Sequence, residues 1–295
     1  MEDPSSEEKQ SLASVELVLD LCFKEAYPDH VLSFLIRRVK EGKVLPLLCC
    51  RKLTFVEKQP PYPIMEKILQ KVQLHRVQEV EIKRIKEPLN PARIVPYLGQ
   101  MVHLNRLHLS EIITDPQNSQ TLHEMHSVFI QPISQFLRLN QLQHIHLDSV
   151  YFLHGHLGKV LRYLDTRLQT LCITNCLLLD LDLIHLSLCP GTSHLRSLDL
   201  SRVILSDIDP DGLRILLSTA WASLEYLDLS WCRISDSQLT AILPALSLCS
   251  RLQHFRFYRN PVTSAGLESR LRQMLPPPKS TLLVLPIPLD CYRDF

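Results

Sequence analysis

Residues 222–239 read ASLEYLDLSWCRISDSQL, and the spacing of the apolar residues changes halfway through this stretch. From Leu224 to Cys232 the residues follow the pattern L-x-x-L-x-L-x-x-C, in which alternate side chains of a short strand point to the same side. The apolar residues from Leu239 to Leu246 then recur at the spacing of a helix. The stretch therefore predicts a strand, a turn and the start of a helix.

The same pattern occurs nine times along the chain. Its first apolar positions are Cys50, Val77, Leu104, Leu142, Leu168, Leu195, Leu224, Leu252 and Leu282. By subtraction, successive starts are 27, 27, 38, 26, 27, 29, 28 and 30 residues apart, close to the range of about 20–29 residues that is typical of leucine-rich repeats. A single strand and helix cannot bury their own apolar face, so the units must stack. We predict an α/β leucine-rich-repeat solenoid, a horseshoe with parallel strands on the concave face and helices on the convex face.

The helical half of a unit is clearest after Leu195. Asp209 is expected to cap a helix that begins at Pro210, and apolar residues at helical spacing follow from Leu213 to Ala220. Residues 213–217 also read L-x-x-L-L, the pattern with which coregulator helices dock into a receptor groove. The solenoid needs the same leucines in its core, and we favour the core. In the next unit, Pro244 is expected to end or kink the helix.

The chain is predicted to have three parts. Residues 1–13 are polar and are expected to form a disordered tail, and residues 14–45 are expected to form an N-terminal helical cap. Two helices are predicted in the cap, from apolar sets at Val15, Leu17, Val18, Leu21 and Cys22, and at Val31, Leu32, Leu35, Ile36 and Val39. Residues 46–295 are predicted to form the repeat domain of about nine units. Within it, residues 114–127 are expected to be a surface insertion, and the segments PPP (276–278) and PIPL (286–289) are expected to make the last unit irregular.

Composition excludes several classes of function. The net charge of +1 gives no general attraction to nucleic acid or to membranes. The polar start MEDPSSEEKQ is followed by no apolar core, and no apolar run is long enough to span a bilayer, so neither a signal peptide nor a membrane span is expected. The nine cysteines are predicted to be reduced, with Cys176 and Cys232 buried at the ninth place of their units.

Motifs of catalysis are missing from the sequence. It contains no Walker-type loop, no G-x-G-x-x-G and no G-x-S-x-G, and its seven glycines are scattered. We therefore predict that the protein is not an enzyme and needs no cofactor. His108, His144 and His146 are expected on one face of neighbouring strands, where they could share a metal ion. No further ligand lies at a suitable spacing, and we favour a solvated, partly basic surface.

The third, fifth and seventh places of each unit are predicted to point out of the concave face. Tyrosine and arginine, the residue types that contribute most to binding in protein interfaces, occur among them near the C-terminus. The alternative is that these side chains only keep the surface of the sheet soluble. The predicted partner-binding residues are Arg106, His108, His144, His146, Asp199, Tyr226, Asp228, His254, Arg256 and Tyr258.

Several strings resemble the PRAME family of leucine-rich proteins, named for an antigen of melanoma. They are LLCCRKL (47–53), PYLGQMVHLNRLHLS (96–110), LDSVYFLHGHLGKVLRYL (147–164), ITNC (173–176), ISDSQLTAILPALSLCSRL (234–252) and FYRNPVTSAGLESRLRQML (257–275). The resemblance runs from about Val15 to the end. It implies an intracellular, germline- and tumour-associated protein that influences proliferation, differentiation and apoptosis. Some members are substrate receptors of cullin-RING ubiquitin ligases through elongin and cullin boxes, and some repress transcription driven by the retinoic acid receptor.

The chain departs from the family pattern at both ends. Family chains usually begin with a further N-terminal region that holds the boxes, and they continue past the stretch corresponding to residues 288–292. We predict a protein-interaction scaffold, a substrate-recognition subunit of a cullin-RING ligase with cullin-2 and elongin B/C as partners, located in the cytoplasm, the nucleus or both. The alternative is a transcriptional repressor or coregulator that binds a nuclear receptor without recruiting a ligase. Neither membrane nor nucleic-acid binding is expected.

Overall fold

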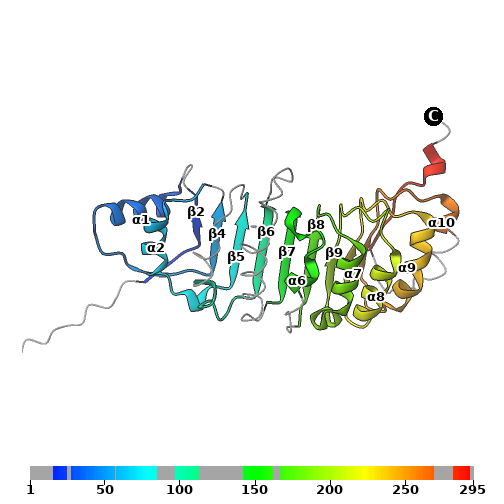
Figure 1. The fold of residues 1–295 in the computed structure, drawn as a ribbon, viewed down its shortest axis with the longest axis horizontal. Coiled ribbons are helices and arrows are strands. Elements are labelled where there is room, and N and C mark those ends of the chain that lie inside the picture. Colours follow the sequence, from blue (N-terminus) through cyan, green and yellow to red (C-terminus); the bar gives the residue numbers. More distant parts are fainter. Residues whose placement is uncertain are drawn as a thin grey trace, which may run out of the picture.

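A parallel sheet runs the length of the molecule (Figure 1). The computed structural model describes residues 16–24, 28–56, 58–84, 97–112, 142–161, 167–268 and 282–292. Ten strands form the sheet in the spatial order β12-β11-β10-β9-β8-β7-β6-β5-β4-β2. Their bounds are β2 (Leu21–Phe23), β4 (Lys52–Val56), β5 (Glu79–Lys83), β6 (Arg106–Ile112), β7 (His144–Val150), β8 (Thr170–Thr174), β9 (Ser197–Asp199), β10 (Tyr226–Asp228), β11 (His254–Arg256) and β12 (Leu282–Val284). The predicted solenoid with one strand per unit is confirmed.

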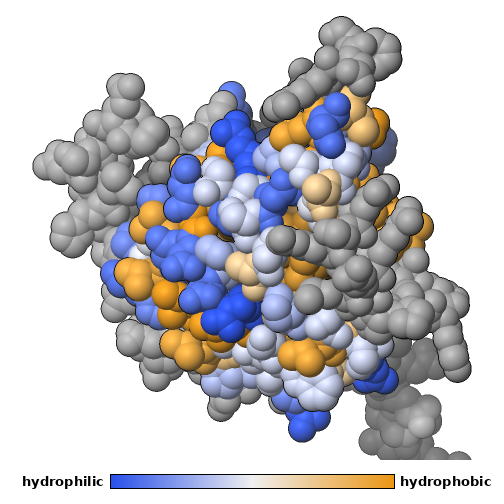
Figure 2. Space-filling model, turned by 90° about the vertical axis from the view of Figure 1, so that its right-hand side faces the viewer, coloured by the Kyte–Doolittle hydropathy of each residue, from blue (hydrophilic) through white to orange (hydrophobic). Residues whose placement is uncertain are grey.

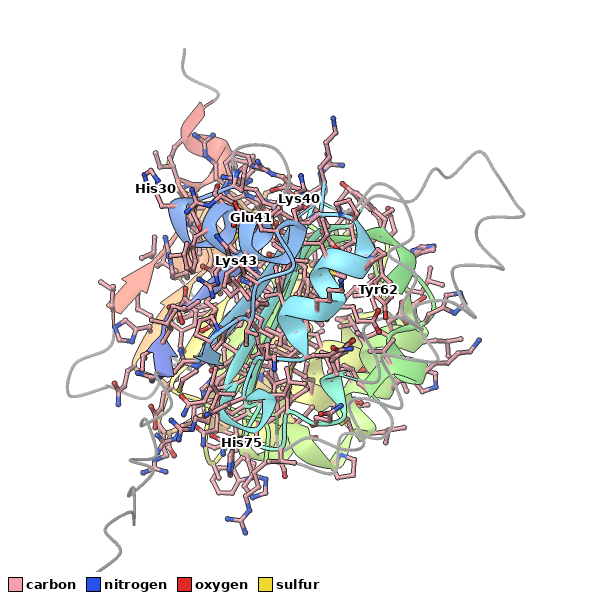
Figure 3. The ribbon with its side chains drawn as sticks, turned by 90° about the vertical axis from the view of Figure 1, so that its left-hand side faces the viewer. His30, Lys40, Glu41, Lys43, Tyr62 and His75 are labelled. Atoms are coloured by element: carbon pink, nitrogen blue, oxygen red, sulfur yellow. The ribbon has the colours of Figure 1, made fainter. Side chains whose placement is uncertain are left out.

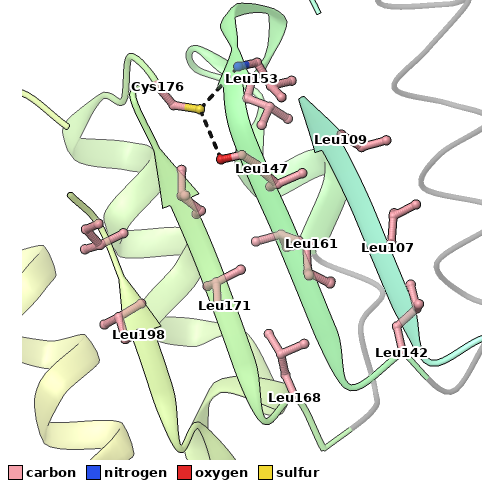
Figure 4. Close-up of a cluster of buried hydrophobic side chains, with 14 of the residues drawn as sticks. Leu107, Leu109, Leu142, Leu147, Leu153, Leu161, Leu168, Leu171, Cys176 and Leu198 are labelled. Atoms are coloured by element: carbon pink, nitrogen blue, oxygen red, sulfur yellow. Dashed lines mark hydrogen bonds between the residues drawn. The ribbon is translucent and has the colours of Figure 1, made fainter. Parts of the chain in front are cut away.

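Eight of the nine predicted strands lie in the predicted register. Each begins two residues after the first apolar position of its unit, so the fourth-place residues pair across the sheet, as Leu171 does with Ile145 and Leu198. These inward side chains are fully buried and form one continuous core, part of which is shown in Figure 4. The ninth prediction is off by two residues, because Leu282 pairs with His254 at the third place instead of occupying the first. Leu282, Leu285 and Ile287 are exposed, so apolar spacing did not report burial there.

The strands are followed by a turn with an unusual backbone. Its eighth-place residue has a positive φ in seven units, and none of the seven is glycine. They are Arg84, Glu111, Ser149, Asn175, Arg202, Trp231 and Arg259. Side chains of this row contact each other between units, as in the ion pair of Arg84 with Glu111 (Nε to Oε2, 3.2 Å) and the hydrogen bond from Asn175 Nδ2 to Ser149 Oγ (2.8 Å). The row lies along the side of the sheet at which the strands end.

Helices cover one face of the sheet, and they are most regular in the C-terminal half (Figure 1). They are α2 (Tyr62–Leu69), α6 (Leu157–Leu161), α7 (Asp180–Leu188), α8 (Pro210–Ala220), α9 (Asp236–Leu248) and α10 (Ser264–Glu268), with short 3-10 helices η1 (Leu74–Arg76), η3 (Tyr151–Leu153), η4 (Pro190–His194) and η5 (Leu289–Tyr292). In α8, Asp209 caps the helix as predicted by accepting a hydrogen bond from Asp211 N (2.9 Å), and the leucines of the L-x-x-L-L motif are buried in the core.

Helix α9 contradicts one of the two expectations for Pro244, that it ends the helix. It continues past Pro244 to Leu248, so the proline does not end it. Residues on both sides of the proline, Leu243, Ala245 and Leu246, are buried in the core. Packing against the neighbouring units therefore holds the last turn although Pro244 donates no backbone hydrogen bond.

The N-terminal segment is only partly helical. Helix α1 (His30–Lys40, Figure 3) confirms the second predicted helix, with Asp29 as its N-cap and Leu32 and Leu35 buried. The first predicted helix is wrong, because residues 16–23 form β1 (Glu16–Val18), which pairs with β3 (Leu47–Cys49), and β2, which joins the main sheet. Leu21 and Phe23 are buried while Cys22 between them is not, which is the two-residue alternation of a strand. The predicted tail, the insertion and residues 276–278 lie outside the described residues.

Candidate functional site

The in-register strands place the predicted site residues in two parallel rows on the face opposite the helices. The third-place row runs Lys52, Glu79, Arg106, His144, Thr170, Ser197, Tyr226 and His254. The fifth-place row runs Thr54, Glu81, His108, His146, Cys172, Asp199, Asp228 and Arg256. Tyr258 follows β11 at the seventh place. All ten predicted residues thus lie on one face, but interactions divide them into an N-terminal and a C-terminal cluster.

Ion pairs dominate the N-terminal end of the two rows. Lys52 Nζ lies 2.7 Å from Glu79 Oε1 and 3.1 Å from Glu81 Oε2, and Lys83 Nζ lies 3.1 Å from Glu81 Oε1. Burial would raise the pKa of Glu81, but the hydrogen bonds and charges of the two lysines outweigh it and lower that pKa. The charges in this cluster are already neutralised by each other, so it offers little unpaired charge to a partner.

The three histidines lie next to this network. The His108 and His146 ring centroids are 5.5 Å apart with the planes tilted by 46°, and His144 Nδ1 is 3.0 Å from Thr170 Oγ1. Within the described part of the chain, no group of three His, Cys, Asp or Glu side chains is arranged to hold a metal ion. The three histidines lie on neighbouring strands of the same face, as predicted.

The burial of His146 predicts a pH dependence of folding. Burial, followed by the positive charges of His108, His144 and Arg106, lowers the pKa of His146. Below about pH 6.5 the unfolded chain binds a proton at this histidine, whereas the folded chain does not until the pH falls to its lower pKa. Stability should therefore fall as the pH decreases through that window and should be unaffected by this group above it. In urea unfolding at several pH values, His146→Gln should flatten the decline, and His103→Gln, at an exposed turn, should not.

The C-terminal cluster is organised around Asp228, whose side chain is almost fully buried. Its Oδ2 accepts a hydrogen bond from Tyr226 OH (3.2 Å) and lies 3.5 Å from Arg256 Nε, and its Oδ1 accepts from Ser230 N (2.8 Å). Burial raises the pKa of Tyr226 and that of the neighbouring Asp199. The buried carboxylate thus holds a tyrosine and an arginine in fixed positions on the open face.

Aromatic rings extend this cluster toward the turn row. Tyr226 and His254 have ring centroids 6.1 Å apart, and the guanidinium of Arg256 lies 5.9 Å from the ring centroid of Tyr258. Tyr258 in turn meets Trp231 edge to face at 6.2 Å, and Arg259 lies 5.1 Å from the Trp231 ring centroid. Trp231, Arg233 and Arg259 were not predicted as site residues, because only strand positions were counted. A tryptophan at the eighth place is the signal that could have found them.

A curved parallel sheet with one strand per repeat and helices on its outer face defines a leucine-rich-repeat protein. Residues 15–294 match the PRAME C-terminal domain, and the chain belongs to the PRAME family. It is 41% identical over 281 residues to human PRAME family member 12, covering 94% of this chain and 56% of that protein. It is 39% identical over 246 residues to mouse preferentially expressed antigen in melanoma-like protein 1, covering 83% and 53%. The chain thus spans about half the length of these relatives.

Solved structures give more distant matches. The TLR13–ssRNA13 complex matches with a TM-score of 0.46 at 14% identity, over 74% of this chain and 28% of that one. An internalin from Listeria monocytogenes matches with a TM-score of 0.38 at 14% identity, over 90% and 92%. Among the described helices, none combines the length and apolar character needed to cross a membrane.

Proposed function

We propose that this chain is a non-catalytic scaffold that binds another protein with the concave face of its C-terminal units. The observation that carries the proposal is the cluster in which buried Asp228 fixes Tyr226 and Arg256 beside Tyr258. Tyrosine and arginine anchors dominate binding energy in protein interfaces. Side chains that are already held in place lose less conformational entropy when a partner binds.

In this proposal the partner is a substrate, and the chain is the substrate-recognition subunit of a cullin-RING ubiquitin ligase. The other subunits are cullin-2 and elongin B/C, and the complex acts in the cytoplasm or nucleus. Membership of the PRAME family supports this assignment. The alternative is a transcriptional repressor that binds a nuclear receptor. Such binding would have to use an exposed surface, because Leu213, Leu216 and Leu217 of the L-x-x-L-L motif are buried.

Removing both anchors is expected to abolish binding and also to reduce stability. In the double variant Tyr226→Ala, Arg256→Ala, Asp228, which is 4% exposed, would keep only the hydrogen bond from Ser230 N. The free energy of unfolding, measured by urea titration, should fall by about 1–3 kcal/mol. Adding Asp228→Asn removes the unpaired charge and should recover part of that loss.

The test is affinity purification of the full chain from germline cells, followed by mass spectrometry. The triple variant Tyr226→Ala, Arg256→Ala, Asp228→Asn is compared with Asp228→Asn alone. Recovery of the partner should fall at least about tenfold in the triple variant; equal recovery would contradict binding by the concave face. Elongin and cullin among the recovered proteins support the ligase assignment. Their absence together with recovery of a nuclear receptor supports the alternative.

A further inference from the structure

A groove lies at the edge of the sheet beyond the concave rows. Its walls are the turns after β10 and β11 and the segment that follows β12. Hydrogen bonds from Phe257 N to Val284 O (2.7 Å) and from Leu289 N to Val262 O (2.9 Å) fix the third wall against the other two. Seen from the C-terminal end, apolar and strongly hydrophilic side chains lie next to each other on the surface (Figure 2). Backbone hydrogen bonds between the last units therefore fix the shape of the groove.

Two of its residues occupy backbone positions that suit glycine or asparagine better. Trp231 and Arg259 stand at the eighth place with φ of 63° and 60°, and Arg233 adds a third positive φ of 57° that no other described unit has at its tenth place. A bulky side chain at positive φ costs conformational energy. The positive φ at the eighth place is shared by seven of the described turns, and arginine also stands there as Arg84 and Arg202. The features that distinguish this site are the tryptophan at that place and the additional positive φ of Arg233.

The groove exposes apolar surface on both sides. Trp231 is 44% exposed, and Ile287 and Leu289 on the opposite wall are 63% and 46% exposed. The edge-to-face contact with Tyr258 and the position of Arg259 over its ring hold the tryptophan in place. An exposed, fixed tryptophan facing aliphatic side chains is suited to bury one apolar side chain of a partner.

The charge of the groove is positive. Arg233 and Arg259 are exposed, and neither forms an ion pair with any residue in the described ranges. Among the described residues, no carboxylate lines the groove. Two aspartates next to the lining in sequence have other partners: Asp236 accepts hydrogen bonds from Thr263, and Asp290 from Ser264 N. The two guanidinium groups are therefore available to carboxylates of a ligand.

We propose that this groove binds an extended acidic peptide segment of a partner protein, with one apolar side chain packed between Trp231 and Ile287 and acidic side chains paired with Arg233 and Arg259. The inference goes beyond the proposed function, since it concerns a surface beside the concave rows and holds whether or not a ligase is recruited. An acidic peptide fits better than nucleic acid, because the wall formed by residues 285–289 is apolar and the net charge of the chain is only +1.

The experiment measures fluorescence anisotropy of three labelled peptides of equal length with the full chain. The first is rich in Glu and Asp around a Leu-Phe pair, the second replaces the acids by Lys, and the third replaces the Leu-Phe pair by Ser. The first should bind at least about tenfold tighter than the other two, and more weakly as salt rises. Equal binding of the basic peptide, or of the acidic peptide without apolar residues, would overturn the proposal.

Variants locate the site. Arg233→Glu with Arg259→Glu should weaken binding of the first peptide at least about tenfold. The matched control is Arg167→Glu with Arg251→Glu. These exposed arginines lie just before their strands, on the opposite side of the sheet from the groove, and their replacement should not weaken binding of the first peptide. Trp231→Gly should also lose binding while its unfolding midpoint stays at or above that of the unchanged protein, because glycine suits the positive φ. Binding unaffected by these changes, or displaced only by a single-stranded oligonucleotide, would refute the assignment.

Discussion

Replacing Asp182 by alanine is expected to lower the free energy of unfolding by about 3–6 kcal/mol, since three backbone donors lose the buried carboxylate that accepts their charge-assisted hydrogen bonds. The Asp182 side chain is 1% exposed and joins two units. Its Oδ2 accepts from Gly155 N (2.8 Å) and Leu179 N (3.0 Å), and its Oδ1 accepts from Leu157 N (3.1 Å). The carboxylate thereby caps α7 and fixes the start of α6 in the preceding unit, so its loss should loosen the contact between the two helices.

Urea unfolding followed by circular dichroism measures this effect. Asp182→Asn keeps one acceptor oxygen and the shape of the side chain, and should fall between alanine and the unchanged protein. Asp211→Ala is the matched control, because Asp211 lies in the first turn of α8 but is exposed, and among the described residues its side chain pairs only with Arg214 at the surface (2.9 Å). It should change stability by about 0.5 kcal/mol or less. A cost below about 1 kcal/mol for Asp182→Ala would show that the carboxylate does not hold the units together.

The repeat was predictable because the inward positions of the regular strands hold apolar side chains, and the fourth-place residue is buried in each of these strands. Leu224, Leu227 and Leu229 are all fully buried, and the units around Leu171 and Leu198 behave in the same way. The prediction failed where apolar residues are exposed. Val18 is 74% exposed, and counting it together with Leu21 produced a helical spacing that the chain does not adopt. At the other end, the exposed residues Leu282 and Ile287 were counted as inward positions, and the predicted last strand was therefore wrong by two residues.

The concave rows were predictable for the same reason, since side chains between inward positions must point outward and neighbouring units are in register. The internal pairing of these rows was not. Tyr226 is only two residues from Asp228, but Arg256 belongs to the next unit, about 28 residues further along, so the local sequence does not show that the nearly buried Asp228 contacts both side chains. The groove escaped prediction because it consists of turn residues such as Trp231 and of Ile287 from a unit whose register was wrong.

Asn260 is the second residue whose loss is expected to be severe, with a cost of about 3–5 kcal/mol for Asn260→Ala, since three buried hydrogen bonds disappear and their backbone partners stay buried. It occupies the ninth place, where Cys176 and Cys232 stand in other units, and it is 4% exposed. Its Nδ2 donates to Leu229 O and Phe257 O (both 2.8 Å), and its Oδ1 accepts from Ile234 N (2.9 Å). One side chain thus satisfies the backbone of two consecutive turns.

The cysteines at the same place give the matched comparison. The thiol of Cys176 accepts from Val150 N (3.4 Å) and donates to Leu147 O (3.7 Å), as Figure 4 shows, and these are weak bonds. Cys176→Ala should therefore cost only about 1–2 kcal/mol, and Asn260→Cys should be less harmful than Asn260→Ala because the sulfur keeps part of the pairing. Equal costs for Asn260→Ala and Cys176→Ala in urea unfolding would contradict this ranking. They would show that the ninth place is filled for its volume, and that the amide of Asn260 adds nothing to the stability of the turns that form the groove.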